Sequence, residues 1–419
     1  MTGTKFSGIA SIGDIPAHWK TYRIKSLLSL RSEKNSGDRD LLSVYLDRGV
    51  ISYNDSDGMQ VHKPSADLSN YQNVHIGDFV LNNQQAWRGS VGISKYDGII
   101  SPAYFVFSLS DKCDPDYMNF LLRDGSMVQQ YETASRGVGT IQRNLYALWF
   151  YESLVALPPL TEQRRIADFL NTKCAEIDAL TADIQTQIDT LEQYKRSVIT
   201  ETVTKGLNPD AEMKDSGIEW VGAIPAHWSI HPIYTYFGER KNKNSFGNED
   251  NLLSLSYGRV IRKDINTSDG LLPESFNTYN IVEAGDIIIR PTDLQNDKRS
   301  LRTGLVKEHG IITSAYIDLC PLKQVDSRYF HFLLHAYDVM KVFYNMGNGV
   351  RQGLNYSEFS RLMVFEPPYE EQVAMADYLE TKVTEVDAII EQKKEQMAVL
   401  DAYKRSLIFG YVTGKKEVV

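Results

Sequence analysis

The sequence Ile15-Pro16-Ala17-His18-Trp19 occurs a second time as Ile224-Pro225-Ala226-His227-Trp228. The sequence Tyr194-Lys195-Arg196-Ser197 returns as Tyr403-Lys404-Arg405-Ser406 at the same offset of 209 residues (224 − 15 and 403 − 194), about half of the 419-residue chain. A repeat of this length is too long for a solenoid unit and matches one domain plus a long helix. We therefore predict two similar halves, which a pseudo-two-fold axis can relate and which suit a bipartite target.

The composition indicates a globular chain that contacts no membrane. Hydrophobic residues make up 42% of the sequence, enough for two or three cores. No apolar run approaches the roughly 18 residues of a membrane-spanning helix, and residues 1–10 lack the features of a signal peptide. Cys113, Cys174 and Cys320 lie far apart without metal-binding or disulfide spacing. We expect reduced cysteines and a cytoplasmic location.

The charge of the chain leaves its partner open. A net charge of −9 argues mildly against a nucleic-acid partner when taken alone. The distribution of charge matters more than its sum, because a local basic surface can act on an acidic protein. Residues 228–365 are near neutral and carry basic clusters at 240–243, 259–263 and 298–302.

Each half contains a mixed block of about 140 residues with short strand patterns separated by turns. Apolar strands are predicted directly after Gly77-Asp78 and Gly285-Asp286, and short helices over 116–122 and 327–334. The apolar framework recurs in both halves while the loops between its elements differ. The predicted fold class is therefore α+β, with two globular domains built on one plan.

The loops in which the two frameworks diverge are rich in Asn, Gln, Arg and Gly. Asn, Gln and Arg side chains read adenine and guanine edges in the major groove, and glycine lets the backbone approach a phosphate. The alternative is that these are ordinary solvated turns. If they bind DNA, the candidate residues are Gln84, Gln85, Arg88, Arg136, Thr140, Gln142 and Arg143 in the first half, and Arg290, Thr292, Gln295, Lys298, Arg299, Arg351 and Gln352 in the second.

A proline pair, at 158–159 and again at 367–368, precedes each of two long heptad patterns. Thr161 is the expected N-cap of the first helix. A helix from 161 to about 205 would be a rod of about 65 Å, and a pseudo-two-fold axis would pair two such rods antiparallel, as a ruler. The alternative is a helix lying along a domain core. The predicted coiled-coil seam consists of Leu170, Ile177, Leu180, Ile184, Leu191 and Tyr194 in the first rod and Leu379, Val386, Ile389, Leu400 and Tyr403 in the second.

These patterns divide the chain into five segments. They are an opening segment with the first recognition domain (1–156), a central spacer helix (157–206), a linker with the second opening segment (207–227), the second recognition domain (228–366) and a C-terminal spacer helix (367–419).

This plan resembles the specificity subunit of type I restriction-modification systems. The likeness rests on the paired Ile-Pro-Ala-His-Trp sequences, on Pro-Pro-Leu-Thr-Glu-Gln (158–163) and Pro-Pro-Tyr-Glu-Glu-Gln (367–372), and on the rods that carry Tyr-Lys-Arg-Ser. It implies that each block reads one half of a split, asymmetric sequence in double-stranded DNA. It also implies that the rods dock two modification (methyltransferase) subunits, to which restriction subunits add. The chain itself would be non-catalytic and bind no cofactor or metal, with S-adenosylmethionine, ATP and Mg²⁺ on the partner subunits.

Three sequences resemble catalytic motifs but are better explained without catalysis. Glu366-Pro367-Pro368-Tyr369 begins with Glu where amino-methyltransferases have Asp, Asn or Ser, and no glycine-rich cofactor loop accompanies it. Residues 209–214 hold the letters of a nuclease motif with the acids only two positions apart. His331 and His335 have a metal-binding spacing but no third ligand. A protein-binding scaffold and a self-contained methyltransferase remain as other functions, which salt-dependent DNA affinity and S-adenosylmethionine binding would distinguish.

Overall fold

The computed structural model describes the chain except residues 1–2, 36, 38, 57–63, 66, 138–142, 267–274, 293, 295–300, 343, 345, 347–352 and 419. The chain forms two compact units. Unit 1 comprises Met1–Ile184 and Lys394–Val419, and unit 2 comprises Gln185–Lys393. Each unit therefore contains one recognition domain together with a part of each long helix, so the compact units cut across the five segments drawn from the sequence.

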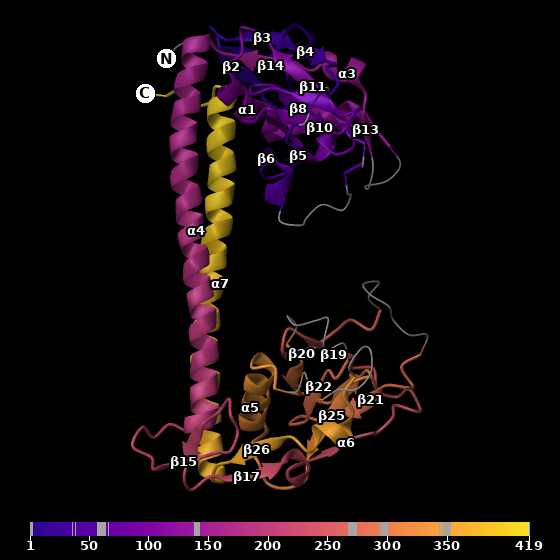
Figure 1. Cartoon of the computed structure of the whole chain (residues 1–419), viewed down its shortest axis with the longest axis vertical. Coiled ribbons are helices and arrows are strands. Elements are labelled where there is room, and N and C mark those ends of the chain that lie inside the picture. The colour runs from indigo at the N-terminus through magenta and orange to yellow at the C-terminus, as the bar shows by residue number, and fades with distance from the viewer. Residues whose placement is uncertain are drawn as a thin grey trace. The chain divides into compact units, whose positions relative to one another are not determined.

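The recognition domain of unit 1 is built on an antiparallel sheet with the strand order β4-β11-β8-β9. Figure 1 labels β4, β11 and β8 of this sheet. These strands are Leu28–Arg31, Tyr104–Leu109, Phe79–Asn82 and Val91–Ile93. Two-stranded ladders surround the sheet: β1 (Thr4–Phe6) with β2 (Asp14–Pro16), β3 (Lys20–Arg23) with β14 (Leu154–Leu157), β5 (Leu42–Tyr45) with β6 (Gly49–Ser52), β7 (Gln72–Val74) with β10 (Gly98–Ile100), and β12 (Ser135–Arg136) with β13 (Asn144–Leu145). The short helices are α1 (Pro115–Arg123), α2 (Gly125–Thr133) and α3 (Ala147–Tyr151).

Unit 2 repeats this plan with the sheet order β18-β25-β22-β23. These strands are Phe237–Glu239, Ile317–Pro321, Ile287–Ile289 and Thr303–Leu305. The ladders are β15 (Met213–Asp215) with β16 (Ala223–Pro225), β17 (Ser229–Pro232) with β26 (Met363–Glu366), β19 (Leu253–Ser256) with β20 (Arg259–Arg262), and β21 (Asn280–Val282) with β24 (Gly310–Ile312). Its short helices are α5 (Ser327–Val339) and α6 (Tyr356–Phe359). The predicted α+β class and the repeated framework are confirmed.

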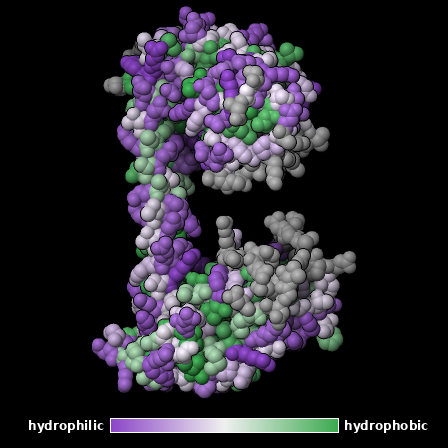
Figure 2. Space-filling view, viewed as in Figure 1, coloured by the Kyte–Doolittle hydropathy of each residue, from purple (hydrophilic) through white to green (hydrophobic). Residues whose placement is uncertain are grey.

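The apolar framework residues form the core of each unit. Phe79 and Leu81 of β8 are fully buried, as are Ile287 and Ile289 at the corresponding places of β22. On the face shown in Figure 2, hydrophilic residues cover much of the surface and hydrophobic residues appear in smaller patches. The burial of the recurring residues accounts for the conserved strand pattern between the two halves, because apolar area removed from water is the main stabilising contribution to such a core.

The long helices are α4 (Leu160–Lys205) and α7 (Tyr369–Val412), and they run antiparallel within each unit. In unit 1 the Lys404 ammonium donates to both carboxylate oxygens of Asp178 at 2.6 and 2.7 Å. In unit 2 the Lys195 ammonium donates to Asp387 at 2.8 Å. Lys195 and Lys404 are the second residues of the repeated Tyr-Lys-Arg-Ser sequence, so this repeat encodes one ion pair between the helices in each unit.

The seam between α4 and α7 differs from the prediction in one of its two rows. Of the predicted residues, Leu170, Ile177, Leu379 and Val386 are buried, and Ile184, Leu191 and Leu400 are partly buried. The prediction that a second row, three residues further on, is also buried is wrong. The residues of that row are 53%, 50%, 43% and 53% exposed: Leu180, Tyr194, Ile389 and Tyr403.

The second buried row lies four residues on from the first, and it includes Cys174, Ile188 and Ile390. Positions three and four residues on both flank the first row on a helix, so periodicity alone does not choose between them. The four-residue row also holds Lys195 and Lys404, whose charges disguise it in the sequence. Their ion pairs with aspartates of the facing helix allow them to lie there.

The two repeated motifs of each half bind one another. In unit 1 the Glu162 carboxylate accepts hydrogen bonds from the Trp19 indole at 3.1 Å and lies 2.8 Å from His18 Nε2. In unit 2 Glu371 makes the same contacts with Trp228 at 3.0 Å and His227 at 2.7 Å. Both indole rings are 1% exposed. The Ile-Pro-Ala-His-Trp sequence is thus a structural element that fastens each recognition domain to the first turn of a long helix.

The glutamine that follows each of these glutamates fixes a second helix. Gln163 Oε1 accepts from the amide of Asp114, the N-cap of α1, at 2.9 Å, and Gln372 Oε1 accepts from the amide of Asp326, the N-cap of α5, at 3.0 Å. The expected N-cap role of Thr161 is wrong. Helix α4 begins at Leu160, and the Pro159 carbonyl already accepts from the amides of Glu162 and Gln163, so Thr161 lies within the first turn.

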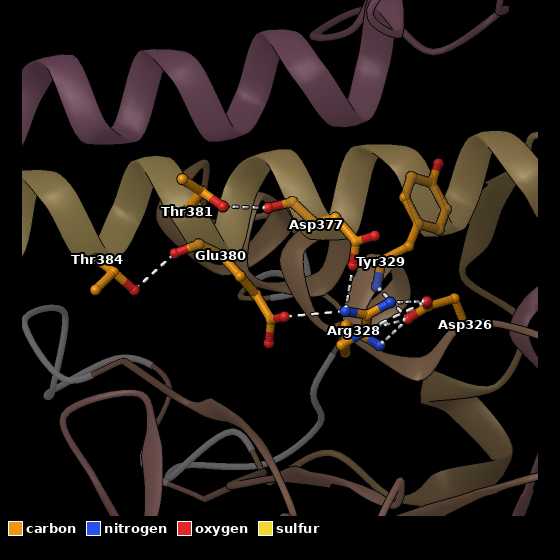
Figure 3. A network of polar contacts seen from close by, with 7 residues as sticks. All are labelled: Asp326, Arg328, Tyr329, Asp377, Glu380, Thr381 and Thr384. Carbon is orange, nitrogen blue, oxygen red and sulfur yellow. Dashed lines mark hydrogen bonds and ion pairs between the residues drawn. The ribbon is translucent and has the colours of Figure 1, made fainter.

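Unit 2 has a further attachment between its recognition domain and α7 (Figure 3). The Arg328 guanidinium, at the start of α5, contacts Asp326 at 2.6 Å, Asp377 at 2.6 Å and Glu380 at 3.0 Å. Asp377 and Glu380 belong to α7, so one arginine joins the two helices through three carboxylates.

Over the described part of the chain, no helix is both long and apolar enough to span a membrane.

Candidate nucleic-acid interface

The structure brings the two candidate loops of unit 1 together. The amide of Leu145, in β13, donates to the side-chain and main-chain oxygens of Asn83 at 2.9 and 3.1 Å. Asn83 follows β8, and β13 closes the hairpin that begins with Arg136 in β12. Residues 84–88 and the ends of the 136–143 loop therefore share one surface, although about 50 residues separate them in the sequence.

Three candidate arginines on this surface lie over tryptophan rings. The guanidinium carbon of Arg136 is 4.4 Å from the centre of the Trp149 ring. Arg143 and Arg88 lie 4.7 and 5.6 Å from the ring of Trp87. A guanidinium stacked on an aromatic face keeps its N–H groups available in its own plane. Arg88 and Arg136 are exposed, so their guanidinium groups are accessible to solvent beside the tryptophan rings.

The neighbouring contacts limit how these side chains turn. Trp87 donates from its indole nitrogen to the carbonyl of Gln84 at 3.1 Å, which fixes the ring. Arg143 also binds Glu132 at 2.8 Å and is partly buried. Gln84 is exposed and Gln85 is partly buried. We define Trp87, Arg88, Arg136, Arg143 and Trp149 as the arginine–tryptophan cluster of unit 1.

The equivalent loops of unit 2 are also joined. The amide of Leu354 donates to the carbonyl of Pro291 at 3.0 Å, the counterpart of the contact between Leu145 and Asn83. Arg290 is partly buried and Thr292 is exposed. The remaining candidates lie outside the described residues: Gln295, Lys298, Arg299, Arg351 and Gln352 in unit 2, and Thr140 and Gln142 in unit 1.

Sequence reasoning missed the aromatic half of the cluster in unit 1. Trp87 stands beside Arg88, and Tyr146 and Trp149 follow Arg143 closely in the sequence. Tyr146 and Trp149 lie with their ring centres 5.2 Å apart and are 49% and 41% exposed. Arginines interleaved with exposed aromatic residues are the pattern that would have revealed this surface, because both residue types contact nucleic acids.

Two of the three sequences that resemble catalytic motifs, Glu366–Tyr369 and the pair His331 and His335, have surroundings that account for them without catalysis. Glu366 accepts hydrogen bonds from Ser229 and Tyr236, both at 3.0 Å, and its partner Lys323 lies at 2.9 Å. Burial lowers the pKa of His331 to about 3 and that of His335 to about 4, so both imidazoles are neutral near pH 7. Among the described residues, no three His, Cys, Asp or Glu side chains are grouped as metal ligands.

The sequence is similar to known specificity subunits. Residues 16–190 match the family model of the type I restriction modification DNA specificity domain. A putative type I restriction enzyme MjaX specificity subunit of Methanocaldococcus jannaschii is 24% identical, over 97% of this chain and 96% of its own length. The type I restriction enzyme MjaVIII specificity subunit of the same organism is 23% identical, over 82% of this chain and 80% of its own length.

Solved structures share the fold. A chain from a study of complex assembly and conformational transition of the type I R-M system has a TM-score of 0.71 at 16% identity, covering 96% of this chain and 99% of that one. The HsdS subunit from Thermoanaerobacter tengcongensis has a TM-score of 0.51 at 16% identity, covering 96% and 98%. These structures share the fold of repeated α+β domains with two long helices. The match over residues 16–190 and the similarity to these specificity subunits confirm the resemblance to type I restriction-modification specificity subunits that was seen in the sequence.

Proposed function

We propose that this chain recognises a bipartite, asymmetric DNA sequence, with one half-site read by the recognition domain of each unit. The observation that carries this proposal is the pairing of a common framework with different loops. Unit 1 presents the arginine–tryptophan cluster where unit 2 has Arg290 and Thr292. Two readers of the same fold with different side chains suit two different half-sites.

Binding should divide into phosphate and base contributions. Exposed arginines attract the DNA backbone and release counterions, so affinity should fall steeply with salt. Arginines held in fixed planes suit bidentate contacts with guanine. In unit 1, Arg88 and Arg136 combine exposure with a stacked orientation, so they are our leading base-reading candidates.

The decisive experiment exchanges residues 20–156 for the first recognition domain of another specificity subunit. Selection from a randomised duplex pool should then show a change in one half of the recognised sequence, with the other half retained. A change in both halves together would contradict the division into two readers. In the native chain, alanine variants of Arg88 and Arg136 should each weaken discrimination at a single base pair, by about 1–3 kcal/mol.

We propose that the long helices set the spacing between the half-sites. Insertion of one heptad after Gln187 in α4 would add about 10 Å while keeping the apolar rows in phase. The spacer of the recognised sequence should change, or binding should be lost, while the preferred bases in each half-site stay the same. An unchanged spacer with full affinity would contradict this role.

We further propose that the helices dock two modification subunits, to which restriction subunits add. Support comes from the exposed apolar residues of the helices: Leu180 and Tyr403 in unit 1, and Ile389 and Tyr194 in unit 2. Members of the two pairs are 209 residues apart, so they present equivalent surfaces suited to two copies of one partner. Replacing Tyr194 and Ile389 by serine should weaken binding of one copy, measured by native mass spectrometry of the mixture with modification subunits.

Catalysis is proposed to lie in these partners. Methylation of adenine and cleavage of DNA would then be directed, rather than performed, by this chain, with S-adenosylmethionine, ATP and Mg²⁺ bound by the other subunits. The support is its similarity to the specificity subunits. Calorimetric titration of the isolated chain with S-adenosylmethionine should give no binding, and saturable binding would contradict the proposal.

A further inference from the structure

Arg302 is the largest charged side chain in the buried interior of unit 2, with an exposed fraction of 0%. It directly precedes β23. Its main chain contacts both Arg290, which follows β22, and Asp338 of α5. Its carbonyl accepts from the amide of Arg290 at 2.8 Å, and its amide donates to the Asp338 carboxylate at 2.5 Å. Asp338 lies in the last turn of α5.

The guanidinium extends these connections. Its Nη1 donates to the carbonyl of Thr292 at 2.5 Å, and its Nε donates to the Tyr344 hydroxyl at 2.9 Å. The Tyr344 hydroxyl in turn donates to Asp338 at 3.0 Å. We call Arg302, Asp338 and Tyr344 the buried hub of unit 2. A buried charge is tolerated only when it is paired and hydrogen-bonded, so the hub holds its neighbouring backbone in place.

The segments fixed by the buried hub lead into the candidate recognition loops. In the sequence, the candidates Gln295, Lys298 and Arg299 follow Thr292, and the candidates Arg351 and Gln352 follow Tyr344. The contact between Leu354 and Pro291 joins the far end of the second loop to the first. The hub therefore holds one end of each loop, while its guanidinium lies inside the domain.

Unit 1 has no arginine at this place. The strand contact from Asn82 to Ser90, at 3.0 Å, corresponds to that from Arg290 to Arg302, so Ser90 is the counterpart of Arg302. The Ser90 hydroxyl donates to the carbonyl of Val44 at 3.1 Å, in a different part of the domain. Like the residues of the candidate recognition loops, the buried hub differs between the two units. It is therefore not part of the framework that both units share.

We propose that Arg302 is a positioning residue that determines which bases unit 2 recognises without contacting DNA. Its guanidinium fixes the backbone at Thr292 relative to Tyr344, which follows α5. The side chains carried by both loops then approach the base edges in one geometry. This inference rests on the proposed function, because it assigns a specificity-determining role within the second reader.

The test uses the full-length chain and selection from a randomised duplex pool, followed by sequencing of the bound DNA. Arg302→Lys keeps the charge but loses the planar fork, and Tyr344→Phe removes only the hydroxyl that accepts from Nε. Both variants should reduce base preference in the half-site read by unit 2, by roughly 10-fold for Arg302→Lys and less for Tyr344→Phe. Preferences in the half-site read by unit 1 should remain those of the native chain.

Arg240→Lys is the matched control. Arg240 lies in the same unit and pairs with the buried Asp286 at 2.8 Å, but it belongs to the framework that both units share. This variant should bind with native base preferences even if its stability falls. Native preferences in both hub variants would overturn the inference, as would an equal loss of preference in Arg240→Lys. A native chain without any sequence preference would instead contradict the proposed function.

Discussion

Both recognition domains have an Arg–Asp ion pair at the same position of the sheet. The residues that pack beside this pair differ between the two units. Arg31 contacts Asp78 at 3.0 Å in unit 1, and Arg240 contacts Asp286 at 2.8 Å in unit 2. Both carboxylates are buried, with exposed fractions of 3% and 1%. The central strand beside the pair carries Val106 in unit 1.

Unit 2 has Asp318 at the corresponding register, opposite Ile288 as Val106 is opposite Val80. A second acid is thus buried beside the ion pair. The comparison shows that strand register and one shared ion pair maintain the framework, while a neighbouring core position can differ even in charge.

The attachment of each recognition domain to the long helices likewise combines contacts that are repeated in both units with contacts that belong to unit 2. The contacts of Trp19 with Glu162 and of Trp228 with Glu371 are repeated. The charged contacts of Arg328 belong to unit 2, since Asp116 stands at its place in α1. Arg259 of β20 contacts Asp387, whereas Gly49 stands at its place in β6. Accordingly Asp178, the counterpart of Asp387, is 62% exposed while Asp387 is 27% exposed.

The largest predicted effect tests the shared part of this comparison. Trp19→Ala and Trp228→Ala should each destabilise their own unit by about 3–5 kcal/mol, because each removes a fully buried indole and leaves a cavity. Hydrogen exchange followed by mass spectrometry should show the loss of protection in unit 1 for the first variant and in unit 2 for the second. A large loss for one variant and a small loss for the other would show that the two contacts are not equivalent.

The next prediction concerns the acid that only unit 2 buries. Burial, together with the neighbouring charge of Asp286, raises the pKa of Asp318 to about 8, and Arg240 opposes this shift. Between pH 4 and pH 8 the folded state therefore keeps a proton that the unfolded state has lost. The contribution of Asp318 to stability therefore falls as pH rises through this window, by at most about 1.4 kcal/mol per pH unit, and levels off above it.

Asp318→Val gives unit 2 the residue found in unit 1. The difference in unfolding free energy between this variant and the native chain should grow with pH from about 4 to about 8, measured by denaturant titration at a series of pH values. The reciprocal variant Val106→Asp should introduce the same trend into unit 1. A pH-independent difference would mean that Asp318 is ionised in the folded protein throughout this range.

The framework was predictable from the sequence because it depends on burial. Strands after Gly77-Asp78 and Gly285-Asp286, and helices that begin near 116 and 327, follow from apolar periodicity and turn residues. The first row of the helix seam was predictable for the same reason. The second row was not, because positions such as Leu180 and Ile188 lie on the same helix face and only the facing helix selects Ile188.

The recognition surface was predictable only in part. The position of the loops follows from the divergence of two alignable frameworks, and the contact between Leu145 and Asn83 joins them. The stacking of Arg136 on Trp149 depends on long-range packing that no local pattern encodes. The buried hub is harder still, since Arg302 resembles a solvated loop arginine until its burial is known.

A smaller effect is expected at the contact of Arg328 with α7. Arg328→Met should destabilise unit 2 by about 1–2 kcal/mol, because it removes charge-assisted hydrogen bonds to Asp326 and to two acids of α7. Asp116→Ala in unit 1 is the matched control and should change stability by less than about 0.5 kcal/mol. Denaturant titration with protection measured in each unit would check both. Equal effects of the two variants would remove this difference between the units.

The smallest expected effect is at Arg259, the second charged contact that unit 1 lacks. Its side chain is 71% exposed, so solvent screens its attraction to Asp387 and the pair should contribute under about 1 kcal/mol. Asp387 also binds Lys195, so a single replacement of Asp387 would remove two contacts. A double-mutant cycle with Arg259→Ala and Asp387→Asn isolates the coupling between Arg259 and Asp387.

This coupling should be measurable at low salt and disappear near 1 M salt, where the screening length is about 3 Å. Arg262→Ala is the control, since Arg262 is on the same strand but pairs with Glu308, away from the helices. Lys195 is only 19% exposed, so its own pair with Asp387 should persist at high salt. If the coupling between Arg259 and Asp387 also persists near 1 M salt, this contact is shielded from solvent. The attachment of unit 2 to the helix would then differ from that of unit 1 by more than a surface ion pair.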